Sequence, residues 1–165
     1  MSRVVSVDRD TFRHTLGSWP SGVAIVTSAH AGERLGMTVS AFSSVSLDPP
    51  LVLVCADKAS NTNKLIHASR AFTVNVLARD QSALSNLFAD KKREAIRFDG
   101  LACKTGATGC PLIPGALASL DCSVRDVVDA GDHIVYVGSV EAAAIDAELE
   151  PLVYWRGGYQ KLEPL

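Results

Sequence analysis

Residues 36–63 read GMTVSAFSSVSLDPPLVLVCADKASNTN, in which two polar clusters stand on either side of one apolar run. The run, Leu51 to Cys55, shows no polar alternation and follows Asp48-Pro49-Pro50, whose prolines favour extended backbone. We expect it to be a strand that is buried on both faces. The second polar cluster begins at Ser60, a residue type that caps helices, and is predicted to start the short helix NTNKLIHAS.

Strand patterns continue on both sides of this stretch. The β-branched and apolar residues Val23 to Thr27 indicate one strand, and the turn AHAGER leads into another at Leu35 to Ser40. The remaining predicted strands are Phe72 to Leu77, Leu117 to Val128, His133 to Ala144 and Leu152 to Trp155. Two of these flank the turn Ala130-Gly131-Asp132 and are expected to pair as a β-hairpin.

Two more helices are predicted at the two ends of the first half of the chain. Asp8 to Ser18 forms one, with Asp8 or Asp10 as its cap and Phe12 and Leu16 four apart on one face. Asp80 is expected to cap the other, whose apolar positions at helical spacing are Leu84, Leu87 and Phe88. The segment KKREAIRF extends this helix or adds one more turn, and residues 100–115 are predicted to be loop.

The order of these elements predicts the fold class. About six or seven strands with a few short helices, and without regular strand–helix alternation, favour a mainly β fold. We expect one domain, residues 1–165, built as a closed or nearly closed antiparallel β-barrel with flanking helices. A doubly wound sheet fits less well, because no GxGxxG follows a strand and no GxxxxGK[ST] occurs.

Composition and charge bear on whether the protein binds nucleic acid, enters a membrane or is secreted. The net charge is −2 with no basic stripe, which argues against nucleic acid. No apolar run is long enough to span a bilayer, and the N-terminal segment MSRVVSVDRDTFRHTLGSWP lacks a signal-peptide core, so a cytoplasmic protein is predicted. Cys55 and Cys122 read as buried thiols, whereas Cys103 and Cys110 have a spacing that fits no familiar zinc pattern; no metal site is predicted.

The chemistry is expected to belong to a bound organic cofactor. No GxSxG elbow occurs, and the four histidines form no cluster with carboxylates and cysteines. The first polar cluster offers neutral donors and acceptors to a planar heterocycle, namely Thr38, Ser40, Ser43, Ser44 and Ser46, with extended backbone near Pro49 and Pro50. The second, Ser60 to Asn63, lies at a helix N-terminus, which favours a phosphate, and Lys58 adds positive charge. The alternative is a polar edge strand followed by an ordinary helix cap.

Five segments together resemble the flavin reductase family, the short reductase components of two-component flavin-dependent monooxygenases. They occur in the family's order and cover most of the chain: WPSGVAIVTS (19–28), GMTVSAFSSVSLDPPLVLVCADKASNTN (36–63), FTVNVLA (72–78), GDHIVYVGSVEA (131–142) and PLVYWRGGYQKL (151–162). The resemblance implies an FMN-binding split β-barrel that works as a homodimer. It further implies oxidation of NADH or NADPH, reduction of FAD or FMN, and supply of the reduced flavin to a separate oxygenase. From the residues, NADH is preferred because no arginine cluster awaits a 2′-phosphate, and FAD is slightly preferred because the short chain and the Arg97-Phe98 segment could accommodate an adenine.

The resemblance also implies site residues. Thr38 to Ser40 and Cys55 to Asp57 line the flavin ring, and His133, in the family's GDH motif, lies near the nicotinamide as the catalytic residue. Pro20, Ser21 and Gly22 border the nicotinamide pocket. The full set expected to bind cofactor is Met37, Thr38, Val39, Ser40, Ser46, Pro50, Cys55, Ala56, Asp57, Ser60, Asn61, Thr62, Phe98, Tyr154 and Tyr159. In this set Ser60 and Thr62 hold the phosphate.

Other interpretations of the same residues remain open. His133 alone fits a surface histidine in a hairpin, and the two tyrosines fit ordinary barrel packing. At the level of function, a flavin-binding electron carrier without nicotinamide chemistry shares the fold. A barrel whose dimer groove binds another ligand, such as haem, is a third possibility, although it requires an axial ligand from the four histidines.

Overall fold

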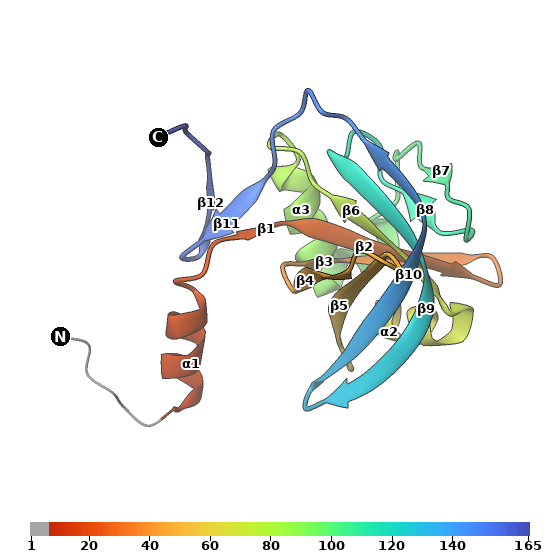
Figure 1. Ribbon diagram of the computed structural model, residues 1–165, viewed down its shortest axis with the longest axis horizontal. Coiled ribbons are helices and arrows are strands. Elements are labelled where there is room, and N and C mark those ends of the chain that lie inside the picture. Colours follow the sequence, from red (N-terminus) through yellow and green to blue (C-terminus); the bar gives the residue numbers. More distant parts are fainter. Residues whose placement is uncertain (1–6) are drawn as a thin grey trace.

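The computed structural model describes residues 7–165, and its main element is one antiparallel sheet of seven strands (Figure 1). The strands lie in the order β3 (Glu33–Val39), β2 (Ala24–His30), β6 (Ala71–Val76), β9 (Ala118–Ala130), β10 (His133–Ile145), β5 (Leu51–Asp57) and β4 (Phe42–Ser46). The predicted strands and the predicted hairpin, β9 with β10, are all present. Residues 1–6, part of the segment expected to lack a signal-peptide core, lie outside the described residues.

The sheet is curled but its hydrogen bonds do not close it. β3 and β4 are its two edge strands, and no ladder joins them in residues 7–165. Side chains from β3 and β5 nevertheless share one core, in which Met37 and Val39 meet Val52 and Val54. The mainly β, antiparallel prediction is therefore confirmed. Of the two forms that we expected, a closed or a nearly closed barrel, the hydrogen bonds do not form the closed one.

Strand β5 differs from its prediction in one respect that matters for the site. Leu51, Val52, Val54 and Ala56 are buried, but Leu53 and Cys55 on the other face are only half-buried. The prediction of burial on both faces is thus wrong for alternate residues. The preceding Asp48–Pro49 bond is cis and lies in a turn, where extended backbone was expected.

Two helices pack beside β2 and β3, and a 3₁₀ helix packs against the second of them. Helix α2 (Asn61–Ser69) begins at Ser60 as predicted, and α3 (Ser82–Ala89) packs against β3. Asp80 does not cap α3: the cap position is Gln81, whose side-chain oxygen accepts from the Ala78 N–H. The 3₁₀ helix η1 (Lys91–Ile96) supplies the expected extra turn, and the predicted loop contains the short hairpin β7 (Lys104–Thr105) and β8 (Pro111–Leu112).

The two ends of the chain form an arm that projects from the sheet (Figure 1). It consists of residues 8–22 and 153–160, which we call the arm, with α1 (Arg9–Leu16) and the three-stranded sheet β1 (Ser21–Gly22), β11 (Val153–Trp155) and β12 (Gly158–Gln160). Asp8 caps α1 by accepting from the Thr11 N–H at 2.7 Å. None of the side chains of α1 is buried, so its apolar face is uncovered. No helix in residues 7–165 has the length and apolar character needed to cross a membrane.

Candidate functional site

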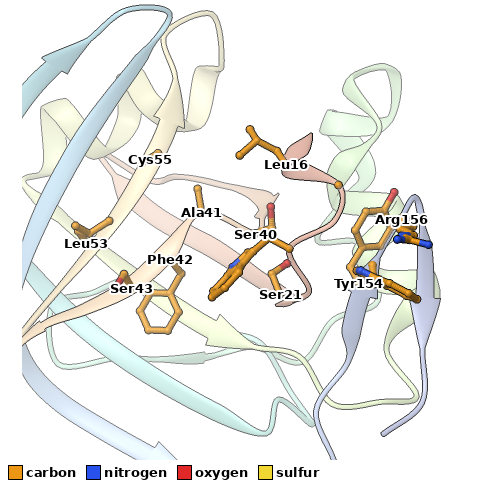
Figure 2. A pocket seen from close by; sticks show the side chains of 13 residues that line it. Leu16, Ser21, Ser40, Ala41, Phe42, Ser43, Leu53, Cys55, Tyr154 and Arg156 are labelled. Atoms are coloured by element: carbon orange, nitrogen blue, oxygen red, sulfur yellow. The ribbon is translucent and has the colours of Figure 1, made fainter. Parts of the chain in front are cut away.

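The larger of two adjoining cavities lies between the arm and the edge of the main sheet (Figure 2). Its volume is about 500 Å³. On the arm side it is lined by Leu16, Gly17, Trp19, Ser21, Tyr154, Trp155 and Arg156. On the sheet side it is lined by Ser40, Ala41, Phe42, Ser43, Leu53 and Cys55. The half-buried face of β5 thus forms one wall, and the aromatic residues of the arm form the other.

The smaller cavity, of about 250 Å³, continues from the first toward α3. It is lined by Val23, Thr38, Val39, Ser40, Ser85, Asn86, Ala89, Tyr154 and Tyr159. Ser40 and Tyr154 line both cavities, so the two form one groove along the end of β3. The Thr38 hydroxyl donates to the Ser85 carbonyl at 2.6 Å, which fixes α3 against this end of the strand.

Helix α2 starts shortly after β5 ends. Asp57, the last residue of β5, stands two residues beyond Cys55 of the larger cavity. The Ser60 hydroxyl accepts from the Asn63 N–H at 3.0 Å, and it also lies 3.5 Å from the Met37 sulfur. The bond from the Ala59 N–H to Asp57, together with Lys91 at 3.3 Å, holds the pKa of Asp57 below its ordinary value. A helix N-terminus with lysines beside it attracts an anion.

His133 lies at the same end of β5, directly opposite Asp57 in the β5–β10 ladder. Its Nδ1 is 2.7 Å from an Asp132 carboxylate oxygen, and this hydrogen bond lowers the pKa of Asp132. With Nδ1 so engaged, Nε2 is the ring nitrogen left for a ligand. Two residues further along β10, Val135 faces Cys55. His133 and Asp57 themselves line neither cavity, and the same holds for Ser60 and Asn61 at the start of α2.

Several predicted site residues are placed elsewhere or are covered. Ser46 and Pro50 stand at the opposite end of β5, roughly 20 Å from Asp57 by the rise of an extended strand, and line neither cavity. Met37, Ala56 and Phe98 are core residues with exposed fractions of 9% or less. Val39 is equally buried but lines the smaller cavity. The Thr62 hydroxyl is fully buried without a hydrogen-bond partner, so it does not reach the surface of the first turn.

The side chains that line the groove are suited to binding planar rings. Burial raises the pKa of the Cys55 thiol, which keeps it neutral and a poor nucleophile. Residues 7–165 contain no group of three histidine, cysteine, aspartate or glutamate side chains that would hold a metal ion. What remains is a half-open groove of aromatic and aliphatic walls with neutral hydroxyls, which is typical of a site for an organic cofactor.

Comparison with known proteins assigns the chain to a family. The model of the flavin reductase like domain matches residues 16–163. The chain belongs to the flavin reductase family. It is 38% identical over 160 residues to the flavin-dependent monooxygenase reductase subunit HsaB of Mycobacterium tuberculosis, covering 96% of this chain and 84% of that protein. It is also 38% identical to a flavin reductase of Pseudomonas putida over 155 residues, covering 93% and 90% of the two chains.

Solved structures show the same architecture for this flavin reductase family member. The NADH:FAD oxidoreductase of Streptomyces globisporus superposes with a TM-score of 0.92 at 34% identity, covering 99% of each chain. The family resemblance seen in the sequence is thereby confirmed.

Part of the groove was missed by sequence reasoning. Phe42 and Leu53 line the larger cavity. Leu53 was predicted only as part of a buried strand, and no prediction was made for Phe42, which stands between two predicted strands. Ser85 and Asn86 line the smaller cavity from α3, where two adjacent polar residues carry no signal of their own. Trp155 follows Tyr154 in the closing segment, so the sequence signal for it was present there.

Proposed function

We propose that the chain is an NAD(P)H-dependent flavin reductase that transfers hydride from NADH to FMN or FAD and supplies the reduced flavin to a separate monooxygenase component. The observation that carries this proposal is the groove. Its hydroxyl-bearing floor at Ser40 and its aromatic wall at Tyr154 match a planar ring. The start of α2, which follows the end of β5 beyond Cys55, matches a phosphate. The family relationship supports the same ligand.

Residues of the groove and of the nearby start of α2 fit a flavin. At the ring end, the exposed Ser40 offers a hydroxyl, and Cys55 and Leu53 offer an apolar surface. At the phosphate end, the first N–H groups of α2 point outward from the helix, and Lys91 and Lys58 lie beside them. Because the Thr62 hydroxyl is covered, we assign the contribution of Thr62 to its main chain.

When bound, the flavin accepts a hydride from the nicotinamide, a reaction in which the cofactors carry the electron chemistry. The chain's part is to stack the two rings, which requires reacting atoms about 3–3.5 Å apart. The walls of the larger cavity, Tyr154 on one side and Leu53 on the other, serve this purpose. His133 positions the nicotinamide or donates to the edge of the flavin; no strong general base is required.

We infer that the flavin is a substrate that leaves. The walls of the groove carry neutral hydroxyls and a single arginine, Arg156, which stacks on Trp155. Of the lysines near the start of α2, Lys58 pairs with Asp129 and Lys91 with Asp57. Such a site favours moderate affinity and exchange. Extensive dialysis should therefore remove the yellow colour, whereas protein that stays fully yellow would contradict this inference.

The finer details rest on the relatives. The Streptomyces globisporus protein is named an NADH:FAD oxidoreductase, and an Agrobacterium fabrum relative, 39% identical over 149 residues, is named an NADH-dependent FMN reductase. We keep NADH as the preferred donor and FAD as the slightly preferred acceptor. A homodimer with a split-barrel fold, one domain over residues 1–165 and a location in the cytoplasm stay predictions.

Steady-state oxidation of NADH tests the proposal. The reductase should oxidise NADH rapidly only when free FMN or FAD is added, because the flavin is the second substrate. A flavin-binding electron carrier without nicotinamide chemistry, the second candidate, would bind flavin and leave NADH unoxidised. The haem alternative is tested by the absorbance spectrum of the purified protein.

A further inference from the structure

The arm is fastened to the rest of the molecule at two places. At its base, main-chain hydrogen bonds join Leu152, Val23 and Leu77 at 2.9–3.1 Å. Beyond the base, all hydrogen bonds from the arm to the rest of the described chain come from one hydroxyl, that of Tyr159. It lies 2.6 Å from the Asn86 amide oxygen and 3.0 Å from the Ser85 hydroxyl.

The available protons determine which group donates in each of these two hydrogen bonds. Tyr159 has one hydroxyl proton, and an amide oxygen can only accept, so Tyr159 donates to Asn86. Ser85, which is 2% exposed, then donates to Tyr159. The Asn86 amide oxygen is therefore the final acceptor in this chain of two hydrogen bonds.

Tyr159 packs against Tyr154, a residue in the wall of the groove. It stands directly opposite Tyr154 in the β11–β12 ladder, and the two rings meet edge to face with centroids 5.5 Å apart. Tyr154 lines both cavities. Further along the hairpin, the Trp155 indole N–H donates to the Ser18 carbonyl, and the Arg156 N–H donates to the Gly17 carbonyl. The end of α1 is therefore held by the same hairpin.

The larger cavity has one wall on the arm and the other on the sheet (Figure 2). Its width is thus the separation between these two bodies. A planar ring gains dispersion energy from both faces only while each wall stays in contact, and a gap of about 0.5–1 Å forfeits a quarter to a half of that attraction. The position of the arm therefore controls how well a ring is held.

We propose that Asn86 is a positioning residue that accepts the Tyr159 hydroxyl proton and so fixes the arm at the distance from the sheet that a planar ring requires. That the ring is a flavin rests on the proposed function. The attachment of the arm through Tyr159 and Asn86 does not depend on that function. No chemistry is assigned to Asn86, which acts through Tyr159 and Tyr154.

Flavin binding tests the role of Asn86 through a pair of substitutions. Asn86→Leu removes the acceptor, and the dissociation constant for FMN, measured by quenching of flavin fluorescence without NADH, should rise about fivefold, the usual effect of one lost hydrogen bond. Asn86→Asp keeps an acceptor oxygen and should restore binding to within about twofold of the wild-type value. Ser82→Ala, on the same helix but outside both cavities, is the matched control.

Tryptophan fluorescence tests the fastening without ligand or activity. The chain has two tryptophans, Trp19 and Trp155, and both lie on the arm and line the larger cavity. Asn86→Leu and Tyr159→Phe should each lower their fluorescence anisotropy and increase quenching by acrylamide, whereas Asn86→Asp should not. The double variant should be no looser than either single one, because both remove the same bond.

The outcomes separate this inference from the proposed function. Wild-type protein that binds no flavin would contradict the proposed function, and the tryptophan measurements would still decide about the fastening. Unchanged anisotropy and quenching in both Asn86→Leu and Tyr159→Phe would overturn the inference. It would also be overturned if Asn86→Asp behaved like Asn86→Leu. Tyr159→Phe, which deletes one oxygen atom, covers the case in which Asn86→Leu fails to fold.

Discussion

Asp57 and His133 face each other at the end of β5, two residues beyond Cys55 of the larger cavity. The pKa of Asp57 lies below its ordinary value of 3.8, first because the Ala59 N–H donates to it and then because of Lys91. A lowered pKa in the folded state means that the charged carboxylate stabilises the fold. This contribution is complete above pH 3.8 and is lost as the pH falls through the lowered pKa.

Asp57→Asn should therefore lower the melting temperature at neutral pH. The difference from wild type should shrink as the pH falls below the ordinary carboxylate range, because the wild-type Asp57 then becomes protonated. Melting curves recorded from neutral to strongly acidic pH provide the measurement. A gap that stayed constant down to the lowest pH would show that charge on Asp57 does not stabilise the fold.

His133→Ala is expected to reduce the rate or raise the Michaelis constant for NADH while flavin binding persists. A positioned proton donor or orienting group typically contributes about 10²–10⁴-fold to a rate, and a purely orienting role would lie at or below the lower end. Stopped-flow reduction and a flavin titration on the same preparation give both values. Complete loss of flavin binding in a folded variant would contradict this role.

At the scale of elements, two helix caps offer a matched comparison. Ser60 caps α2 beside the groove, and Asp8 caps α1 on the arm. Loss of either cap costs about 1 kcal/mol of stability. Ser60→Ala should in addition weaken binding of FMN but leave riboflavin, which lacks the phosphate, unaffected. Asp8→Ala should spare both ligands, and equal losses of FMN and riboflavin in Ser60→Ala would contradict a phosphate site at α2.

These elements also show how far the sequence is informative. The cap at Ser60 and the strands of the main sheet follow from local patterns, because capping and side-chain alternation depend on neighbours in the chain. The half-exposed face of β5 was not predictable, since an apolar run looks the same beside a core and beside a cavity. Likewise Ser85 and Asn86 line the cavity only because α3 packs against β3. Gln81, and not Asp80, occupies the cap position of α3, where its side chain accepts a hydrogen bond from the Ala78 N–H.

At the scale of the whole molecule, the arm exposes apolar side chains that a monomer leaves uncovered. Phe12 is 54% exposed, Leu16 55% and Trp19 78%. Exposed apolar groups gathered in this way are typical of interaction surfaces, and the predicted homodimer would cover them. The amphipathic pattern of α1 indicated a buried face, but only the assembly determines what buries it.

Phe12→Asp should shift the protein from dimer toward monomer in sedimentation velocity, because it places a charge in the apolar face. His14→Asp, two residues further along and on the opposite side of α1, is the control and should leave the assembly unchanged. Wild-type protein that sediments as a monomer at high concentration would refute the homodimer prediction.

The most direct test of the central claim is to mix the protein anaerobically with NADH and, in separate experiments, FMN, FAD or riboflavin. The concentrations of NADH and of oxidised flavin are then monitored by their absorbance. Our account predicts that oxidised flavin and NADH disappear together, one for one, with many turnovers of flavin per protein chain. NADH that persists in the presence of each flavin, while flavin binds, would contradict it.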